Sequence, residues 1–458
     1  MIKLLLISCV AVISAQGETR FAAEALQGPL EKGDIAGVVS IFYANGREER
    51  SAVGYADLET KRPISGDQIY AQCSQTKGFC GVTIAKLVED GLLSLDDPIA
   101  KYIPEFGKMY IKIAETNSTY RLVPAKTAIT IRMCMNHSAG FPFEVPNFSE
   151  MGGWSRRMPL KSLALTLAAM PLVYEPGTQY LYSNLGIDMA AAVIERVTGM
   201  RWEQYLKKTV FEPLAMTSAS FTPSEELLKE HIRGYTILGN ADKSFTLHPM
   251  EKAAYYPFSD EYVFPSAGAG LWISANDQYK FYKMLFNRGV GDNGARVLKT
   301  ETVEELLMKP SRPDSIKGTP VSIQGYSLGF KISPDPKTGH RIFGHGGAYS
   351  SGCYMDLDRG TLKLVATSIL GYNGPAWGDQ LEEAAQKFFD YAFDKESSQG
   401  VCPPANGVCP QPNGVCPQLK GVCPPTNGVC PPANGVCPQP KGVCPQPMSD
   451  ASKGETVM

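Results

Sequence analysis

The sequence predicts an α+β protein in which helices cover one antiparallel sheet and an inserted region is mostly helical. Two strand-like stretches lie near the start of the chain, at 36–43 and 47–55, and further short ones follow from residue 326. The chain between them is mostly helical and rich in turns, and a helix-like stretch stands outside the strands at each end. One sheet that pairs early with late strands and buries its faces under helices is the economical solution for this order.

Composition allows such a core and argues against some partners. The chain has 458 residues, of which 43% are hydrophobic and 20% charged, as in ordinary globular proteins. The formal net charge is -2 and no long basic run occurs, so nothing favours nucleic acid or an anionic membrane. No stretch has eighteen uninterrupted apolar residues, and we therefore expect no membrane span.

The first residues have the form of a secretory signal. Lys3 precedes an apolar run that reaches Ile13, and small residues follow at Ala15 and Gly17. Such a segment is too short to cross a bilayer and is removed on export. We therefore expect a signal peptide at 1–17 and a secreted, extracellular protein whose folded domain spans 18–395.

The first half of that domain mixes strand signals with helical periodicity. Asn45-Gly46 separates the two early strand-like runs and is a strong hairpin signal. The stretch Gln72–Gly91 predicts a helix buried on most sides, because its apolar residues cover more than one stripe and Gly91 is placed to end it. The other elements expected here are a helix at 21–30, a loop with a short helix at 92–106 and a polar insertion at 108–126.

The second half returns to strands and closes with a helix. Asn184–Thr198 has apolar residues at helical spacing and ends before Gly199, and another helix is expected at 202–211. Residues 221–266 show no clear pattern and are interpreted as irregular. The remaining expected elements are strands at 326–332, 341–344, 349–356 and 362–370 and a helix at 379–393.

A low-complexity tail follows the domain. From Gly400, the tetrapeptide Gly-Val-Cys-Pro recurs seven times with a period of seven residues, within a repeat region at 396–447 that precedes a polar end at 448–458. Proline and glycine in every unit exclude a coiled coil, and the tail lacks the apolar residues for a core. An odd number of cysteines leaves at least one without a partner in the tail, so self-association through disulfides is one hypothesis and a solvated extension is the other.

Cysteines in the domain leave the disulfide pattern open. Of 12 cysteines in the chain, four lie in the domain, at Cys73, Cys80, Cys134 and Cys353. Export permits disulfides, and four cysteines allow three pairings. Cys73 and Cys80 are poor partners, because seven residues of helix would separate them by roughly 10 Å.

Three glycosylation sequons begin at Asn117, Asn136 and Asn147. A glycoprotein is expected only if a sequon is exposed in an exported chain. We expect exposure only of Asn117, because residues 115–120 have the polarity of a surface loop.

The Gln72–Gly91 stretch opens with the one S-x-x-K of the chain, Ser74 to Lys77. Residues three apart on a helix are neighbours, so the hydroxyl and the amine can meet. A serine becomes a nucleophile when a base lies within hydrogen-bond reach, and burial lets a lysine serve as that base. A capping serine followed by a solvated lysine is the structural alternative.

Two further motifs supply partners. Tyr182 and Asn184 follow a Glu-Pro-Gly turn, and a phenol can relay protons while an amide can bind both an ammonium and a carbonyl. Gly346 and Gly347 follow His345 between two strand-like runs, where an edge strand could donate an oxyanion N–H. A core histidine beside a bulge is the alternative for the last motif.

As a set and in this order, the three motifs resemble those of class C β-lactamase-like serine hydrolases. That family includes penicillin-binding peptidases, D-amino-acid peptidases, esterases and LACTB-type proteases. The likeness extends over roughly Val38–Leu370, with supporting stretches at Leu95–Ile99, Asn136–Pro142, Glu175–Gly177 and Ala267–Leu271. It implies a β-lactamase/transpeptidase-like fold.

The resemblance also implies roles. Ser74 would be the acylated nucleophile, and Lys77 with Tyr182 would handle the protons. The residues that would bind substrate are Asn184, His345, Gly346, Gly347 and Ala348, with the backbone N–H groups of Ser74 and Ala348 forming the oxyanion hole.

Position 345 departs from the lactamase pattern. His345 stands where lactamases have the lysine of K-T-G, so a permanent cation becomes a group that titrates near neutrality. Lys337-Thr338-Gly339 spells K-T-G literally, but the prolines just before it favour a hairpin turn. Efficient β-lactam hydrolysis is therefore not expected.

These observations predict a secreted serine hydrolase that acts through an acyl-enzyme on an ester, an amide or a D-amino-acid-containing bond. Its partner would be a small molecule or peptide substrate. No H-E-x-x-H, paired C-x-x-C or phosphate-binding glycine loop occurs, so no metal or cofactor is expected. The alternative is a catalytically silent binding protein, or an extracellular matrix or surface component that uses the Cys-Pro tail.

Overall fold

A computed structural model describes residues 21–116, 119–143, 159–239, 245–250, 265–311, 325–370 and 377–394. The chain divides into two units between Ala392 and Phe393. The expected signal peptide and the repeat tail lie outside the described residues, as do Asn117 and Asn147.

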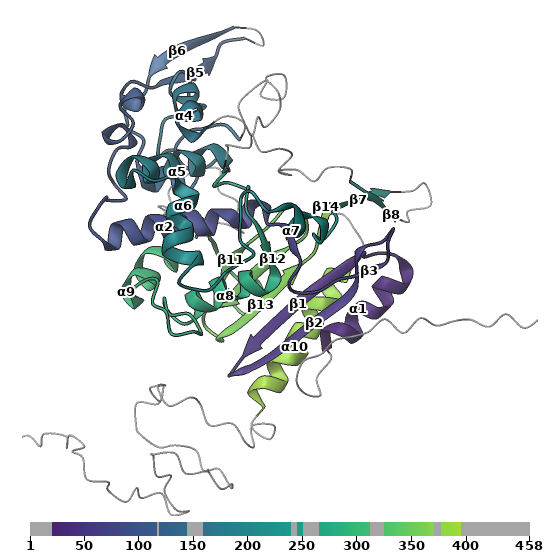
Figure 1. The fold of residues 1–458 in the computed structure, drawn as a ribbon. Helices are drawn as coiled ribbons and strands as arrows, with labels where there is room; N and C mark the ends of the chain where they lie inside the picture. Colours follow the sequence, from purple (N-terminus) through teal and green to yellow (C-terminus); the bar gives the residue numbers. More distant parts are fainter. Residues whose placement is uncertain are drawn as a thin grey trace, which may run out of the picture. The chain divides into compact units, whose positions relative to one another are not determined.

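The predicted antiparallel sheet is present, and it joins both ends of the folded body (Figure 1). It has seven strands, in the order β10-β11-β12-β13-β1-β2-β3, so the early hairpin lies beside the late strands. Asn45 and Gly46 both take positive φ, as the hairpin turn between β1 and β2 requires. The strands are β1 (Gly37–Ala44), β2 (Arg47–Asp57), β3 (Arg62–Pro63), β10 (Lys331–Pro334), β11 (Arg341–Gly346), β12 (Gly352–Asp356) and β13 (Thr361–Ala366).

Both faces of this sheet are buried, and alternating side chains of β1 serve the two. Val38 and Phe42 pack with α1 (Phe21–Lys32) and α10 (Trp377–Phe393) in one apolar cluster. Val39 and Ile41 belong to a larger cluster that includes α2 (Thr76–Glu89) and α8 (Ala275–Phe286). The period-two alternation in the sequence therefore places one core on each side of the sheet.

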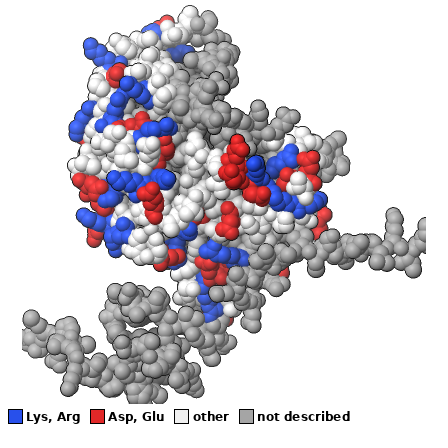
Figure 2. Space-filling view, viewed as in Figure 1, with Lys and Arg blue, Asp and Glu red and all other residues white. Residues whose placement is uncertain are grey.

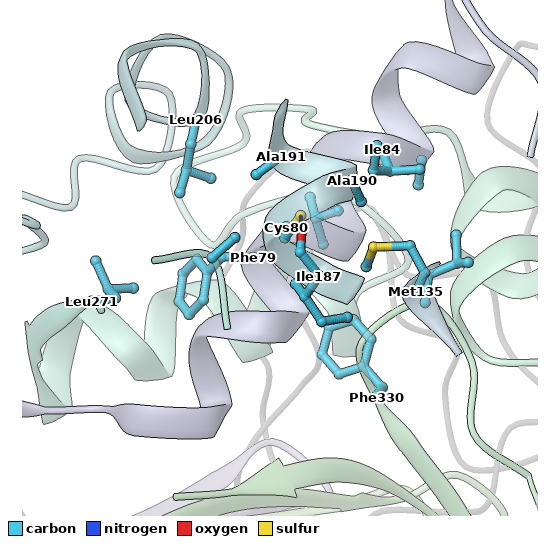
Figure 3. Packing of buried hydrophobic residues seen from close by; sticks show 14 of the residues in the cluster. Phe79, Cys80, Ile84, Met135, Ile187, Ala190, Ala191, Leu206, Leu271 and Phe330 are labelled. Carbon is cyan, nitrogen blue, oxygen red and sulfur yellow. Dashed lines mark hydrogen bonds between the residues drawn. The ribbon is translucent and has the colours of Figure 1, made fainter. Parts of the chain in front are cut away.

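The inserted region between α2 and β9 (Trp272–Ser274) is largely helical, as expected, and packs against α2. Figure 3 shows Phe79 and Cys80 of α2 against Ile187 and Ala190 of α5 (Asn184–Thr198), which ends at Gly199 in the left-handed conformation. The insertion's other helical elements are η2 (Ile99–Lys101), η3 (Pro104–Gly107), α3 (Ile131–Met135), α4 (Leu160–Ala168), α6 (Trp202–Leu206), η4 (Lys207–Phe211) and α7 (Glu225–Lys229). The predicted helix at 202–211 is thus present, with its second half wound as a π-helix.

Three small sheets were not predicted. The polar insertion at 108–126 is a hairpin of β5 (Tyr110–Ala114) and β6 (Tyr120–Pro124). Its strands are mostly exposed, so their sequences do not show the alternation of apolar and polar residues that marks a strand packed on a core. The stretch interpreted as irregular contains α7, β7 (Tyr235–Gly239) and β8 (Phe245–Pro249). The third sheet pairs β4 (Ile69–Ala71) with β9 (Trp272–Ser274), while β14 (Ile369–Leu370) joins β7.

The strand predicted at 326–332 is mostly wrong, because only its end enters β10. Gly329 has φ +80 and lies so close to α2 that a Cβ there would be 2.2 Å from the Lys77 carbonyl oxygen. The segment therefore packs against the helix backbone before β10 begins. Likewise, 349–351 form the turn before β12, where Ser350 has φ +57.

Two short helical segments complete the described elements, α9 (Thr300–Thr302) and η5 (Val303–Leu307). Of the described helices, none is long and apolar enough to cross a membrane.

Candidate active site

Ser74 lies in a single 3-10 turn, η1 (Cys73–Gln75), that leads directly into α2. Cys73 has φ +50, a conformation that costs a non-glycine residue on the order of 1 kcal/mol or more. The surroundings hold this turn: the Thr76 hydroxyl donates to the Cys73 carbonyl at 2.7 Å and accepts from the Leu271 N–H at 3.2 Å. Ser74 remains partly exposed while its neighbours are buried. The turn therefore presents the hydroxyl at the surface of a rigid helix start.

Lys77 is fully buried, and its amine reaches the Ser74 hydroxyl. The Nζ–Oγ distance is 3.3 Å, so the contact predicted from the three-residue spacing is present. Nζ also donates to Asn184 Oδ1 at 2.6 Å and to the Gly268 carbonyl at 2.7 Å. Burial lowers the Lys77 pKa to about 7, although nearby Asp188 acts in the opposite direction. A large fraction of this amine is therefore neutral near pH 7.

Tyr182 and Asn184 stand at the start of α5, as the turn before them predicted. Ser183 caps the helix by accepting from the Gly186 N–H, and its own hydroxyl donates to the Pro142 carbonyl at 2.7 Å. These two hydrogen bonds hold Ser183 in place and so position its chain neighbours, Tyr182 and Asn184. The Lys77 Nζ lies 4.6 Å from the centre of the Tyr182 ring. The first two predicted motifs thus meet at one amine.

The third motif ends β11 and touches the nucleophile turn. Strand β11 is second from the sheet edge, so it is not the edge strand that the sequence suggested, but β10 pairs with it only as far as Gly344. The Gly347 N–H donates to the Ser351 carbonyl at 2.8 Å. A Cβ on Gly347 would lie 2.5 Å from the Gln72 carbonyl oxygen, so only glycine lets the strand end approach η1 this closely.

The His345 ring is buried and both its nitrogens have partners inside the protein. Nδ1 lies 2.6 Å from the Gly346 carbonyl and Nε2 lies 3.1 Å from the Tyr326 hydroxyl. A carbonyl only accepts, so Nδ1 carries the proton and Nε2 accepts from Tyr326. Burial and the charges of Lys77 and Lys331 hold the His345 pKa well below its usual value. Burial therefore moves the His345 pKa away from the neutral range expected from the sequence and favours the neutral ring.

Two sequence patterns that imitate catalytic motifs lie elsewhere. Lys337 is in the turn between β10 and β11, where the Asp335 carboxylate accepts from the Lys337 and Thr338 N–H groups. Gly325 to Gly329 spells G-x-S-x-G, but its serine, Ser327, is fully buried and donates to the Leu307 carbonyl at 2.6 Å. Neither Lys337 nor Ser327 belongs to the site.

The cysteines and one sequon are also placed. Cys73, Cys80, Cys134 and Cys353 are all buried free thiols. Burial raises the Cys73 pKa to about 12, so this thiol beside Ser74 stays protonated. Asn136 is buried, so this sequon is inaccessible in the folded protein.

Sequence reasoning missed three residues of the site: Asp188, Gly268 and Tyr326. Asp188 is the one carboxylate among the otherwise apolar residues 185–194 of α5, four residues after Asn184, and that contrast was a usable signal. Gly268 lay in a stretch noted only for its resemblance. Nothing local in the sequence marks Tyr326 as a partner of His345.

Comparison with known proteins identifies the family of this chain. The Beta-lactamase family model matches residues 22–385. The chain belongs to the Beta-lactamase family. Protein Rv1367c of Mycobacterium tuberculosis strain H37Rv is 27% identical over 334 residues, which cover 69% of this chain and 80% of that one. Protein flp of Staphylococcus aureus strain COL is 28% identical over 216 residues, 47% of this chain and 41% of its own.

Several solved structures share the fold of this chain. EstCE1, a hydrolase with promiscuous acyltransferase activity, has a TM-score of 0.65 at 21% identity and covers 80% of this chain and 97% of its own. Simvastatin synthase LovD of Aspergillus terreus has a TM-score of 0.68 at 19% identity, over 84% of this chain and 100% of its own. The octameric penicillin-binding protein homologue of Pyrococcus abyssi has a TM-score of 0.59 at 25% identity, and the match covers 80% of this chain and 76% of its own. The β-lactamase/transpeptidase-like fold predicted from the sequence is thereby confirmed.

Proposed function

We propose that this protein is a serine hydrolase that forms an acyl-enzyme on Ser74. One observation carries the proposal: a fully buried lysine amine, with a pKa of about 7, lies 3.3 Å from the Ser74 hydroxyl. A neutral amine at that distance can take the hydroxyl proton as the oxygen attacks a carbonyl.

The steps follow from the positions of the groups. Ser74 Oγ bonds to the substrate carbonyl carbon and its proton passes to Lys77. The N–H groups of Ser74 and Ala348 receive the negative charge that develops on the carbonyl oxygen. Tyr182, in contact with Lys77, gives its proton to the leaving alcohol or amine as the bond between the carbonyl carbon and the leaving group breaks, and Lys77 passes the serine proton to Tyr182 to replace it. Water then enters by the same route, and its attack releases the acid and restores Ser74.

The other residues of the three motifs position the reacting groups. Gly346 and Gly347 bring the strand end close to η1, and Asn184 orients both Lys77 and the substrate. Because both His345 nitrogens are engaged within the protein, we assign this ring to positioning the strand end and not to direct contact with substrate.

The substrate class is an ester, an amide or a D-amino-acid-containing bond. A neutral buried ring where a permanent cation would hold a carboxylate favours substrates without a carboxylate at that point. Two structural neighbours are described as a hydrolase with promiscuous acyltransferase activity and a synthase, and the first description supports acyl transfer as the class of reaction. Basic and acidic side chains are interspersed on the face seen in Figure 2, an arrangement that suits a small uncharged partner better than nucleic acid.

The direct test is hydrolysis of a small panel by the whole protein and its Ser74→Ala variant. The panel comprises a p-nitrophenyl ester, D- and L-alanyl anilides and nitrocefin. We expect turnover of the ester or an anilide, slow or absent turnover of nitrocefin, and loss of all turnover in Ser74→Ala. Activity should rise with pH through about 7, as Lys77 loses its proton. Equal turnover by the variant would reject the proposal.

The proposal includes export, based on the signal-like segment at 1–17, and self-association through the tail cysteines. A silent binding or matrix protein is the second candidate, favoured by the seven Gly-Val-Cys-Pro units. Electrophoresis of the protein from culture medium, with and without reductant, tests export and self-association through disulfides. Multimers that vanish on reduction and on deletion of 396–458 support cross-linking, and monomers in both lanes reject it.

A further inference from the structure

A buried carboxylate stands behind the proposed base and has no place in the steps above. Asp188 lies in α5, one helical turn after Asn184, and has no exposed surface. Residues four apart on a helix share a face, so α5 directs both side chains toward Lys77. An isolated buried charge is costly, and carboxylates are retained in such places when they are paired or functional.

Asp188 forms hydrogen bonds with Ser266 and Gly268, the loop whose Gly268 carbonyl accepts from Lys77. Its Oδ1 accepts from the Gly268 N–H at 3.1 Å and lies 3.2 Å from the Ser266 hydroxyl. Its Oδ2 has no hydrogen-bond partner among the described residues. One carboxylate oxygen thus fixes the loop. Burial raises the Asp188 pKa to about 7, although the Gly268 N–H, the Lys77 charge and the Ser266 hydroxyl act in the opposite direction.

Gly268 connects this carboxylate to the amine. Its N–H donates to Asp188 and its carbonyl accepts from Lys77 Nζ at 2.7 Å. A Cβ at this position would lie 2.7 Å from the Asn184 Cβ, so only glycine allows the loop to reach between α5 and the amine. A movement of Asp188 would therefore displace an acceptor of the Lys77 ammonium.

Asp188 also faces Lys77 electrostatically. The other ionisable groups around this amine are the Cys73 thiol on η1, Lys331 on β10, His345 on β11 and the Tyr182 phenol. The thiol is protonated, the histidine is neutral and Lys331 repels a second cation. Among these groups Asp188, in its ionised form, supplies the negative charge that favours the Lys77 ammonium, against the burial that disfavours it.

We propose that Asp188 is a positioning residue, which aligns the Lys77 amine through Gly268 and stabilises its protonated form by charge. This inference rests on the proposed role of Lys77 as the base for Ser74. The carboxylate does not touch the reacting atoms. Its effect should appear in the pH dependence of Ser74 reactivity and in kcat more than in KM.

Asp188→Asn separates charge from hydrogen bonding, because the amide oxygen can still accept from Gly268 and Ser266. The measurement is the rate at which a fluorophosphonate labels Ser74 across pH 5 to 9, which needs no knowledge of the substrate. We expect the acidic limb of this profile to move to lower pH by about one unit, as removal of an opposite charge demands. Ser266→Ala removes one donor to the carboxylate, disfavours its ionised form, and should move the limb in the same direction by less.

Asp277→Asn is the matched control. Asp277 is also a buried carboxylate, but it binds the Ser218 N–H at 2.7 Å and lies in α8, outside the site. This control should leave the limb where the wild type has it. An unmoved limb in a folded Asp188→Asn or Ser266→Ala variant, whatever the rate, would overturn the inference. Absence of Ser74 labelling in the wild type would instead overturn the proposed function.

Discussion

The two faces of the central sheet bury similar strand residues but different chemistry. Beneath α1 and α10, the cluster around Phe42, Phe388 and Phe389 is apolar and aromatic. On the opposite side, the large cluster around α2 and α5 adjoins fully buried Lys77 and Asp188. Glu49 is a carboxylate buried on the first face, where it accepts from the Ala22 N–H of α1. The second face instead buries an amine and a carboxylate beside a partly exposed serine hydroxyl.

This difference separates residues that stabilise the fold from residues that serve the site. Burying an amine and a carboxylate costs free energy unless each is bonded, so their presence together next to a serine hydroxyl indicates a function that needs them there. Substitutions on the apolar face should therefore change stability without changing the chemistry. Substitutions near Lys77 should do the reverse.

Lys77→Met should produce the largest effect. Loss of the proposed base should lower kcat/KM by about a thousandfold or more, which corresponds to roughly 4 kcal/mol of transition-state stabilisation. Steady-state kinetics on the best panel substrate measure this, with circular dichroism to confirm folding. Turnover close to the wild-type rate would reject the assignment of Lys77.

Phe388→Ala tests the apolar face. The Phe388 ring is buried in α10 with its centre 5.9 Å from that of Phe42, and its removal leaves a cavity. We expect the free energy of unfolding to fall by about 3–5 kcal/mol, with kcat of the folded protein unchanged. Denaturant titration and kinetics at low temperature test the two halves. A large loss of kcat in folded protein would break the contrast between the faces.

Gly347→Ala tests the contact between β11 and the nucleophile turn. The added methyl group would meet the Gln72 carbonyl oxygen at 2.5 Å, so the strand end must shift away from Ser74. A displaced oxyanion donor should cost roughly ten- to a hundredfold in kcat/KM. Gly378→Ala is a suitable control, since a Cβ there would have nothing within 4 Å and, like Gly347, this glycine does not take positive φ. Equal kinetic effects in both variants would contradict this account.

Tyr326→Phe should have the smallest effect. It removes the donor to His345 Nε2 and leaves that buried nitrogen without its hydroxyl partner, at a cost of about 1–3 kcal/mol in stability. If His345 acts by positioning, kcat/KM should fall less than tenfold. A loss as large as that of Lys77→Met would show that this pair takes part in the chemistry.

The parts of the fold that sequence predicted are those with local signals. Asn45-Gly46 determined a hairpin, and α5 ends at Gly199 because glycine alone takes that conformation without cost. The β5–β6 hairpin was not predicted, because exposed strands do not alternate apolar with polar residues. The strand expected at 326–332 gave way to a contact with the Lys77 backbone, which no local pattern encodes.

The site divides in the same way. The Ser74 to Lys77 contact followed from helical spacing. Asp188, Gly268 and Tyr326 lie far along the chain from the residues they support, so only the folded structure brings them together. The neutral state of His345 likewise arises from burial, which sequence does not report.

The central claim is that Ser74 is a nucleophile activated by Lys77. Its most direct measurement is fluorophosphonate labelling of the whole protein, followed by peptide mapping, with the Ser74→Ala and Lys77→Met variants beside the wild type. The account predicts one adduct on the peptide containing Ser74, none in Ser74→Ala, and a labelling rate lowered by at least a hundredfold in Lys77→Met. Labelling at another residue, or labelling of Ser74 that is indifferent to Lys77, would contradict it.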